Sequence, residues 1–206
     1  RTMTEDLERW AGLAEERLAD TDIEPYVMPG NDDPWSIDEV LERSPVVNNC
    51  DGRIVDVGGH EMLSCGYSNP TPWASPRELP EDELYEKLRA LAGQLRSPET
   101  AIFNLHVPPY GSGLDTAMEI DEELRPVLKG GRPHEIPVGS TAVRQLIEEC
   151  QPAVSLHGHI HESRGITQIG RTVVINPGSD YSSGRLEGCV VDLTPDGVKN
   201  FRLLSG

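Results

Sequence analysis

The chain has 206 residues, a length that favours a single domain spanning residues 1–206. Hydrophobic residues make up 36% of it, no apolar run approaches the roughly 20 residues that cross a bilayer, and no signal peptide opens it, which excludes membrane, collagen-like and disulfide-scaffold classes. Its 35 acidic and 18 basic residues leave a net charge of −17, a field that repels nucleic-acid phosphates. There is no basic patch to offset it, so we expect neither a nucleic-acid nor a membrane partner.

The first half of the chain is predicted to alternate short helices and strands. Apolar residues recur at helical spacing over residues 4–20, and a short buried strand follows at 25–28. Ser36 and Glu39 have the spacing of a capping box, which predicts a short helix that begins at Ser36 and runs through Leu41. Strands are expected at 46–48, 53–57, 61–66 and 101–105, with a leucine-striped helix before the last of them.

The second half opens with an excursion over residues 110–138 that is rich in Gly, Pro and acidic residues and is predicted to be loop-like. A helix over 140–149 and a strand over 153–156 follow. Two hairpins close the chain, at 166–169 with 172–175 and at 189–193 with 198–203. Strands interleaved with helices and followed by hairpins predict an α/β fold in which a mixed sheet is layered with helices.

The four cysteines, Cys50, Cys65, Cys150 and Cys189, form no CxxC pair and are too sparse for a disulfide framework. We therefore predict free, largely buried thiols in a cytoplasmic protein. His60 and His134 lie in hairpin and loop contexts and are expected at the surface.

Polar side chains that can bind metals follow three of the predicted strands. Asn31 comes after the first strand, His106 after another, and His159 and His161 after a third. Loops at strand ends are where layered α/β proteins bind ligands, and neutral imidazole suits Zn, Fe and related ions. We expect Gly30 and Gly158 to allow the tight turns that aim these side chains inward. Taken singly, each residue has an ordinary alternative: Asn31 caps a turn, and His106 is a solvated strand-end residue.

The imidazoles of His157, His159 and His161 are so close in sequence that holding them together costs free energy unless an anion or a metal binds them. This favours His159 and His161 as ligands. The remaining member of this cluster, His157, is interpreted as strand-end packing.

Several of these segments resemble the later metal motifs of the calcineurin-like metallophosphoesterases, and in particular one prokaryotic branch of that family. The matching segments are Gly30-Asn31-Asp32, His106-Val107-Pro108-Pro109-Tyr110-Gly111 with Leu114-Asp115, Gly158-His159-Ile160-His161-Glu162-Ser163, and Asn176-Pro177-Gly178-Ser179. The resemblance covers the chain from about residue 25 to its end.

This resemblance implies a four-layered α/β/β/α sandwich with mixed sheets that holds two divalent metal ions, Mn, Fe or Zn. Asn31, His106 and His159 would hold one ion, and His161 would help to hold the other. The implied activity is hydrolysis of a small phosphomonoester or phosphodiester by attack of a metal-bound hydroxide, while the cations neutralise the phosphoryl oxygens.

The sequence departs from the family pattern at two places. Asp32 stands where the family usually carries a His that orients the phosphate or protonates the leaving group. A carboxylate there repels a phosphate unless it is protonated or shared with a cation, so Asp32, the candidate catalytic residue, favours substrates with good leaving groups; its alternative role is to cap a turn. The family's earlier Asp-x-His and Gly-Asp motifs are also absent, and we expect the domain to be incomplete at its N-terminus.

These departures leave two alternatives to the enzyme. One is a non-catalytic scaffold or regulatory module that retains the fold. The other is a structural site for a single metal ion, held by Asn31, His106 and His159 alone.

Overall fold

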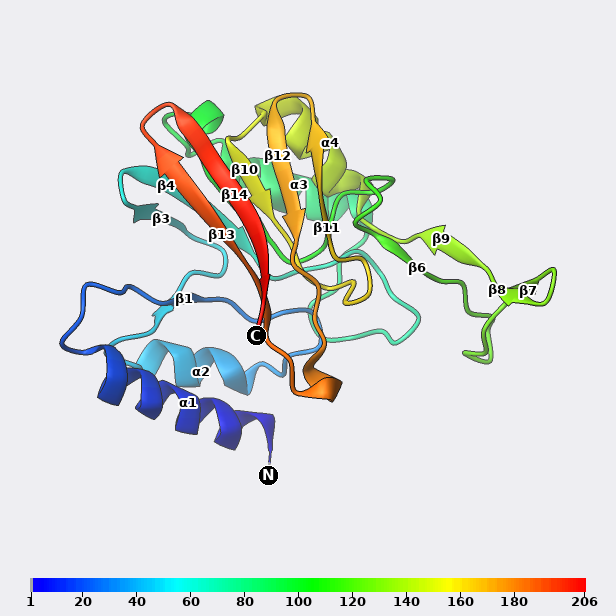
Figure 1. Ribbon diagram of the computed structural model, residues 1–206, viewed down its shortest axis with the longest axis horizontal. Helices are drawn as coiled ribbons and strands as arrows, with labels where there is room; N and C mark the ends of the chain where they lie inside the picture. Colours follow the sequence, from blue (N-terminus) through cyan, green and yellow to red (C-terminus); the bar gives the residue numbers. More distant parts are fainter. Residues whose placement is uncertain (1) are drawn as a thin grey trace.

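The computed structural model describes residues 2–206 and is organised around a six-stranded mixed sheet (Figure 1). The strand order is β11-β12-β10-β5-β4-β3; the four inner strands are parallel and the two edge strands antiparallel. The strands are β3 (Ile54–Val57), β4 (His60–Cys65), β5 (Ile102–Leu105), β10 (Val154–Leu156), β11 (Gly165–Ile169) and β12 (Thr172–Asn176). The parallel strands therefore end at one edge of the sheet.

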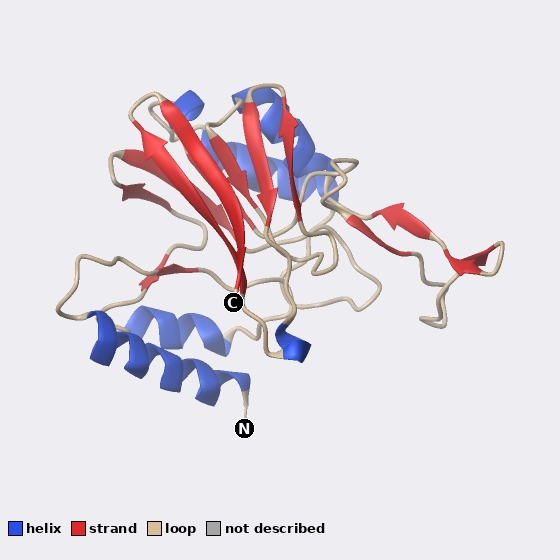
Figure 2. Cartoon of the chain, in the orientation of Figure 1, coloured by secondary structure: helices blue, strands red, loops and turns tan. Residues whose placement is uncertain are grey.

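Two helices, α3 (Glu81–Ala92) and α4 (Thr141–Cys150), cover one face of this sheet, as Figure 2 shows. Leu84 and Leu88 form the buried stripe of α3 and pack with Phe103 of β5 in the larger core. Helix α4 begins where the sequence predicts, because the Ser140 hydroxyl accepts the Val143 N–H at 3.2 Å as an N-cap. A 3-10 turn, η1 (Pro98–Thr100), precedes β5, and a second, η2 (Tyr181–Ser183), precedes β13.

The opposite face of the sheet is covered by a hairpin of β13 (Glu187–Thr194) and β14 (Gly197–Ser205). Ile102 and Ile175 of the sheet form a second core with apolar side chains of the hairpin, such as Val191. Over residues 2–206 the layers are therefore helix, sheet and hairpin. This arrangement confirms the predicted α/β sandwich with a mixed sheet; the described residues form three of the four layers that the resemblance implied.

The N-terminal segment forms a smaller unit beside the sheet, in which α1 (Met3–Leu18) packs on α2 (Ser36–Arg43), and β1 (Tyr26–Val27) pairs in parallel with β2 (Asn48–Asn49). The capping box predicted at Ser36 is wrong. Ser36 is already the first helical residue and its hydroxyl contacts that of Thr4, while the capping box of this region belongs to Thr2 and Glu5 at the start of α1.

The excursion is more ordered than predicted. Residues 116–137, here called the arm, project from the sandwich as two short antiparallel ladders (Figure 1). Their strands are β6 (Thr116–Met118), β9 (Glu135–Pro137), β7 (Leu128–Lys129) and β8 (Arg132–Pro133). Pieces of two or three residues that contain prolines carry no readable alternation of apolar and polar positions, so the sequence suggested a loop.

Two further predictions can be compared with the structure. All four cysteines are free thiols, as predicted, and burial raises the pKa of Cys65 to about 11. His60, expected at the surface, is instead buried, with Nδ1 at 2.8 Å from the Thr100 carbonyl oxygen. Within residues 2–206, no helix combines the length and the apolar character needed to cross a bilayer.

Candidate metal centre

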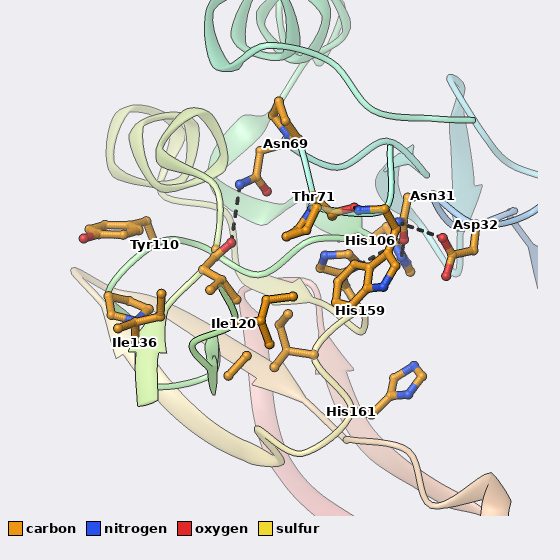
Figure 3. Close-up of a pocket in the computed structure, with 18 of the residues that line it drawn as sticks. Asn31, Asp32, Asn69, Thr71, His106, Tyr110, Ile120, Ile136, His159 and His161 are labelled. Carbon is orange, nitrogen blue, oxygen red and sulfur yellow. Dashed lines mark hydrogen bonds between the residues drawn. The ribbon is translucent and has the colours of Figure 1, made fainter. Parts of the chain in front are cut away.

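Asn31, His106 and His159 come together at the sheet edge where the parallel strands end. They follow β1, β5 and β10, so three distant stretches of chain supply one cluster. The Asn31 Oδ1 atom lies 2.8 Å from Nε2 of His106 and 3.0 Å from Nδ1 of His159. The two imidazole rings meet edge to face, with centroids 5.0 Å apart (Figure 3). Their donor atoms thus converge on one point.

The backbone around these side chains differs from the prediction that Gly30 and Gly158 permit tight turns. Gly30 is not in the left-handed region; it is needed because a Cβ there would lie only 2.6 Å from Cε1 of His106. Gly158 is not left-handed either and has open space beside it. The residue with positive φ is His159 itself, at 63°, a conformation that costs a non-glycine residue on the order of 1–2 kcal/mol. Such strain concentrates at functional sites.

His157 holds the two central strand ends together. Its buried ring places Nδ1 3.0 Å from the Leu105 carbonyl oxygen and 2.9 Å from that of Val107, which flank His106. Nε2 lies 2.8 Å from the Ser155 hydroxyl, so both ring nitrogens have partners. The interpretation of His157 as strand-end packing agrees with these contacts, and the packing fixes the backbone of His106.

The Asn31 amide is oriented by a relay that sequence reasoning missed. Its Nδ2 donates to the Ser75 hydroxyl oxygen at 2.7 Å, and that hydroxyl in turn donates to Glu78. Glu78 also accepts the Ser75 N–H at 2.9 Å and both the N–H and the hydroxyl of Thr71. With Nδ2 engaged, Oδ1 faces the two histidines. The Ser75-x-x-Glu78 spacing was the available signal, here used in a loop rather than a helix.

Burial keeps both imidazoles neutral. It lowers the pKa of His106 to about 3, with neighbouring His159 and His161 adding to the effect. Burial also lowers the pKa of His159, against the opposing influence of Asp32. Neutral imidazole is the form that binds metals, so the cluster is ready to act as a ligand at neutral pH.

The three donor atoms suit a divalent ion of the Zn or Mn type. Two ligands at right angles and about 2.1 Å from one ion lie about 3 Å apart, which is the separation seen between Asn31 and each histidine. Imidazole nitrogen and amide oxygen are both ordinary ligands for such ions. Within residues 2–206 no three His, Cys, Asp or Glu side chains gather as a metal cluster, so the set consists of two imidazoles and one amide.

The other two predicted site residues line the same pocket but stand apart from this cluster. His161 is exposed, its ring packs edge-on against Tyr181 with centroids 5.7 Å apart, and Figure 3 shows it away from the other histidines. Asp32 is also exposed, and its Oδ1 accepts a long 3.4 Å hydrogen bond from Nδ2 of Asn31. The pocket that all five residues share has a volume of about 950 Å³.

Fold and site together define an α/β sandwich with a candidate metal centre at the carboxyl ends of its parallel strands. No protein-family model matches the chain. The uncharacterized protein MJ1162 of Methanocaldococcus jannaschii is 31% identical to it over 167 residues, which are 79% of this chain and 68% of that protein. The chain belongs to the same family as this archaeal protein.

Solved structures share its fold. TT1561 of Thermus thermophilus matches with a TM-score of 0.62 at 20% identity, over all of this chain and 80% of that one. A second solved chain matches with a TM-score of 0.60 at 18% identity, over 98% of this chain and 68% of that one. A chain described as a novel archaeal phosphodiesterase is 17% identical over 98% of this chain and 94% of that one, but its TM-score of 0.35 is too low to indicate a common fold.

Proposed function

We propose that this protein is a calcineurin-like metallophosphoesterase, a metal-dependent hydrolase of a small phosphomonoester or phosphodiester. One observation carries the proposal: Oδ1 of Asn31 lies between Nε2 of His106 and Nδ1 of His159, although the three residues come from three different strand ends. The same residues carry the resemblance of the sequence to that family. The free thiols support a cytoplasmic location as part of the proposal.

In this proposal Asn31, His106 and His159 hold one divalent ion, and His161 contributes to a second. Bound divalent ions activate water and neutralise charge on phosphoryl oxygens. The strained His159 backbone and the relay from Glu78 to Asn31 hold the ligands in place before binding, which lowers the entropic cost of forming the site.

Hydrolysis forms one bond from water to phosphorus and breaks the bond from phosphorus to the leaving group, which departs with a proton. We assign Asp32 to the side of the leaving group, because it lines the pocket next to Asn31. Its negative charge favours esters whose leaving group needs little protonation.

The full-length protein should hydrolyse p-nitrophenyl phosphate or bis-p-nitrophenyl phosphate with Mn, Fe or Zn. His159→Ala should abolish this activity. His60→Ala is the matched control. It also removes a buried imidazole, but at the start of β4, away from the strand ends that carry the candidate site. The folded protein with this substitution should retain the activity. The absence of turnover with every metal would refute the proposed hydrolase activity. Metal binding without turnover would favour a scaffold or regulatory module.

A further inference from the structure

The pocket has a polar corner and an apolar wall. Asn31, His106 and His159 form the corner. The wall consists mainly of apolar side chains from the arm and the neighbouring loops: Trp73, Tyr110, Met118, Ile120, Ile136 and Val138. Figure 3 shows Tyr110, Ile120 and Ile136 on one side and the histidines on the other. A phosphate ester has the same two-part character, with a charged phosphoryl group and an organic group.

The charges around the pocket limit what else the substrate can carry. Within residues 2–206 no Lys or Arg lines it, whereas five carboxylates do: Asp32, Asp33, Glu81, Glu119 and Glu162. Some are engaged with the protein, since Glu81 accepts the N–H groups of Thr141 and Ala142, and Glu119 pairs with His134 at 2.5 Å. None has a cation on the pocket wall beside it. Glu119 also lies 3.8 Å from Lys129, a cation outside the pocket lining. Away from the metal corner, a second anionic group on the substrate would therefore meet mainly negative charge.

The apolar wall is anchored to the loops of the sandwich at the base of the arm. At the base of the arm, the Asp115 carboxylate accepts the N–H groups of Gly111, Ser112, Gly113 and Gly139. The Val138 N–H donates to the Asp115 carbonyl oxygen at 2.8 Å, and Asn69 donates to the Val138 carbonyl oxygen at 3.3 Å. The first residue of the arm, Thr116, exchanges two hydrogen bonds with the Ser163 hydroxyl. The base of the arm is thus fixed to the sandwich, and the β6–β9 ladder carries Ile136 from that base.

We infer that the substrate is a singly charged phosphate ester with an uncharged apolar or aromatic group, and that this group binds against Ile120 and Ile136 of the arm. The inference rests on the proposed function, which places the phosphoryl group at the metal corner. A phosphodiester with one aromatic substituent is therefore a better candidate substrate than a polyanionic ester such as a nucleoside triphosphate.

Binding can test this independently of turnover. Dimethyl phosphate and methyl phenyl phosphate carry the same single charge and differ in one aromatic group, and each can be titrated into the metal-loaded protein by NMR. Methyl phenyl phosphate should bind at least about tenfold more tightly, and an added carboxylate on its ring should weaken binding about tenfold. The double variant Ile120→Ser/Ile136→Ser should lose the preference for the phenyl group.

Leu128→Ser is the matched control, because Leu128 lies in the outer ladder of the arm, is 60% exposed and does not line the pocket. It should keep the wild-type preference. Equal binding of the two esters, or a preference that survives the double variant, would overturn the inference. If methyl phenyl phosphate binds as expected but no ester is hydrolysed with any metal, the proposed function fails and the apolar binding site stands.

Discussion

Gly30→Ala is the sharpest perturbation of the candidate metal centre, because it changes no ligand. A Cβ at this position would lie 2.6 Å from Cε1 and 2.9 Å from Nε2 of His106. Restoring ordinary contact at 3.4 Å requires the ring to retreat by about 0.8 Å. Metal ligands tolerate only about 0.2 Å of displacement, so His106 would leave the position that it shares with Asn31 and His159.

The expected consequence is a loss of metal affinity of about 10- to 100-fold, the range typical of residues that position a ligand. Affinity for Zn or Mn can be measured by competition with a chelating dye, and thermal unfolding without metal shows whether the variant is folded. Gly158→Ala is the control, since Gly158 has no neighbour within 4 Å and no positive φ, and its affinity should equal that of wild type. Wild-type affinity in Gly30→Ala, or an equal loss in both variants, would show that the contact between residue 30 and His106 does not control metal binding.

Three further substitutions test the surrounding structure. Burial alone would raise the pKa of Glu78, but its hydrogen bonds from Ser75 and Thr71 outweigh burial and hold the pKa below its usual range. Because folding favours the ionised carboxylate, Glu78 stabilises the folded protein at neutral pH, and this stabilisation is lost on acidification. Glu78→Gln should unfold at a lower temperature than wild type at pH 7, and the gap should close below about pH 4. Arg77 is fully buried, pairs with Asp38 and stacks on Trp35, so Arg77→Met should cost about 3 kcal/mol in urea unfolding; a cost under about 1 kcal/mol would contradict this. His157→Phe leaves two carbonyl oxygens without their donor and should cost about 1–3 kcal/mol in the same assay, and an unchanged midpoint would contradict it.

The features of the site that could be predicted from the sequence are those set by topology. His106 and His159 each follow a short apolar strand of the central sheet, and its parallel strands end at one edge, so strand-end positions alone were enough to bring these two residues together. Asn31 follows β1, which pairs with β2 outside that sheet, so its place in the cluster depends on how the N-terminal segment packs against the sheet. The α/β class was predictable for a similar reason, because periodicity distinguishes α3 and α4 from the strands around them.

The remaining features depend on contacts between segments far apart in the chain. Ser75 orients Asn31 across 44 residues, and no local pattern encodes that contact. The need for Gly30 comes from the ring of His106 packing on its backbone, not from a turn. His60 was wrongly expected at the surface because its burial depends on Thr100, which the fold brings beside it.

The most direct test of the metal centre at Asn31, His106 and His159 is anomalous X-ray scattering from crystals of the protein grown with Zn or Mn. A metal centre formed by these three residues predicts a peak about 2.0–2.2 Å from Oδ1 of Asn31, Nε2 of His106 and Nδ1 of His159. No peak at this position, with the three side chains still hydrogen-bonded to one another at saturating metal, would contradict it.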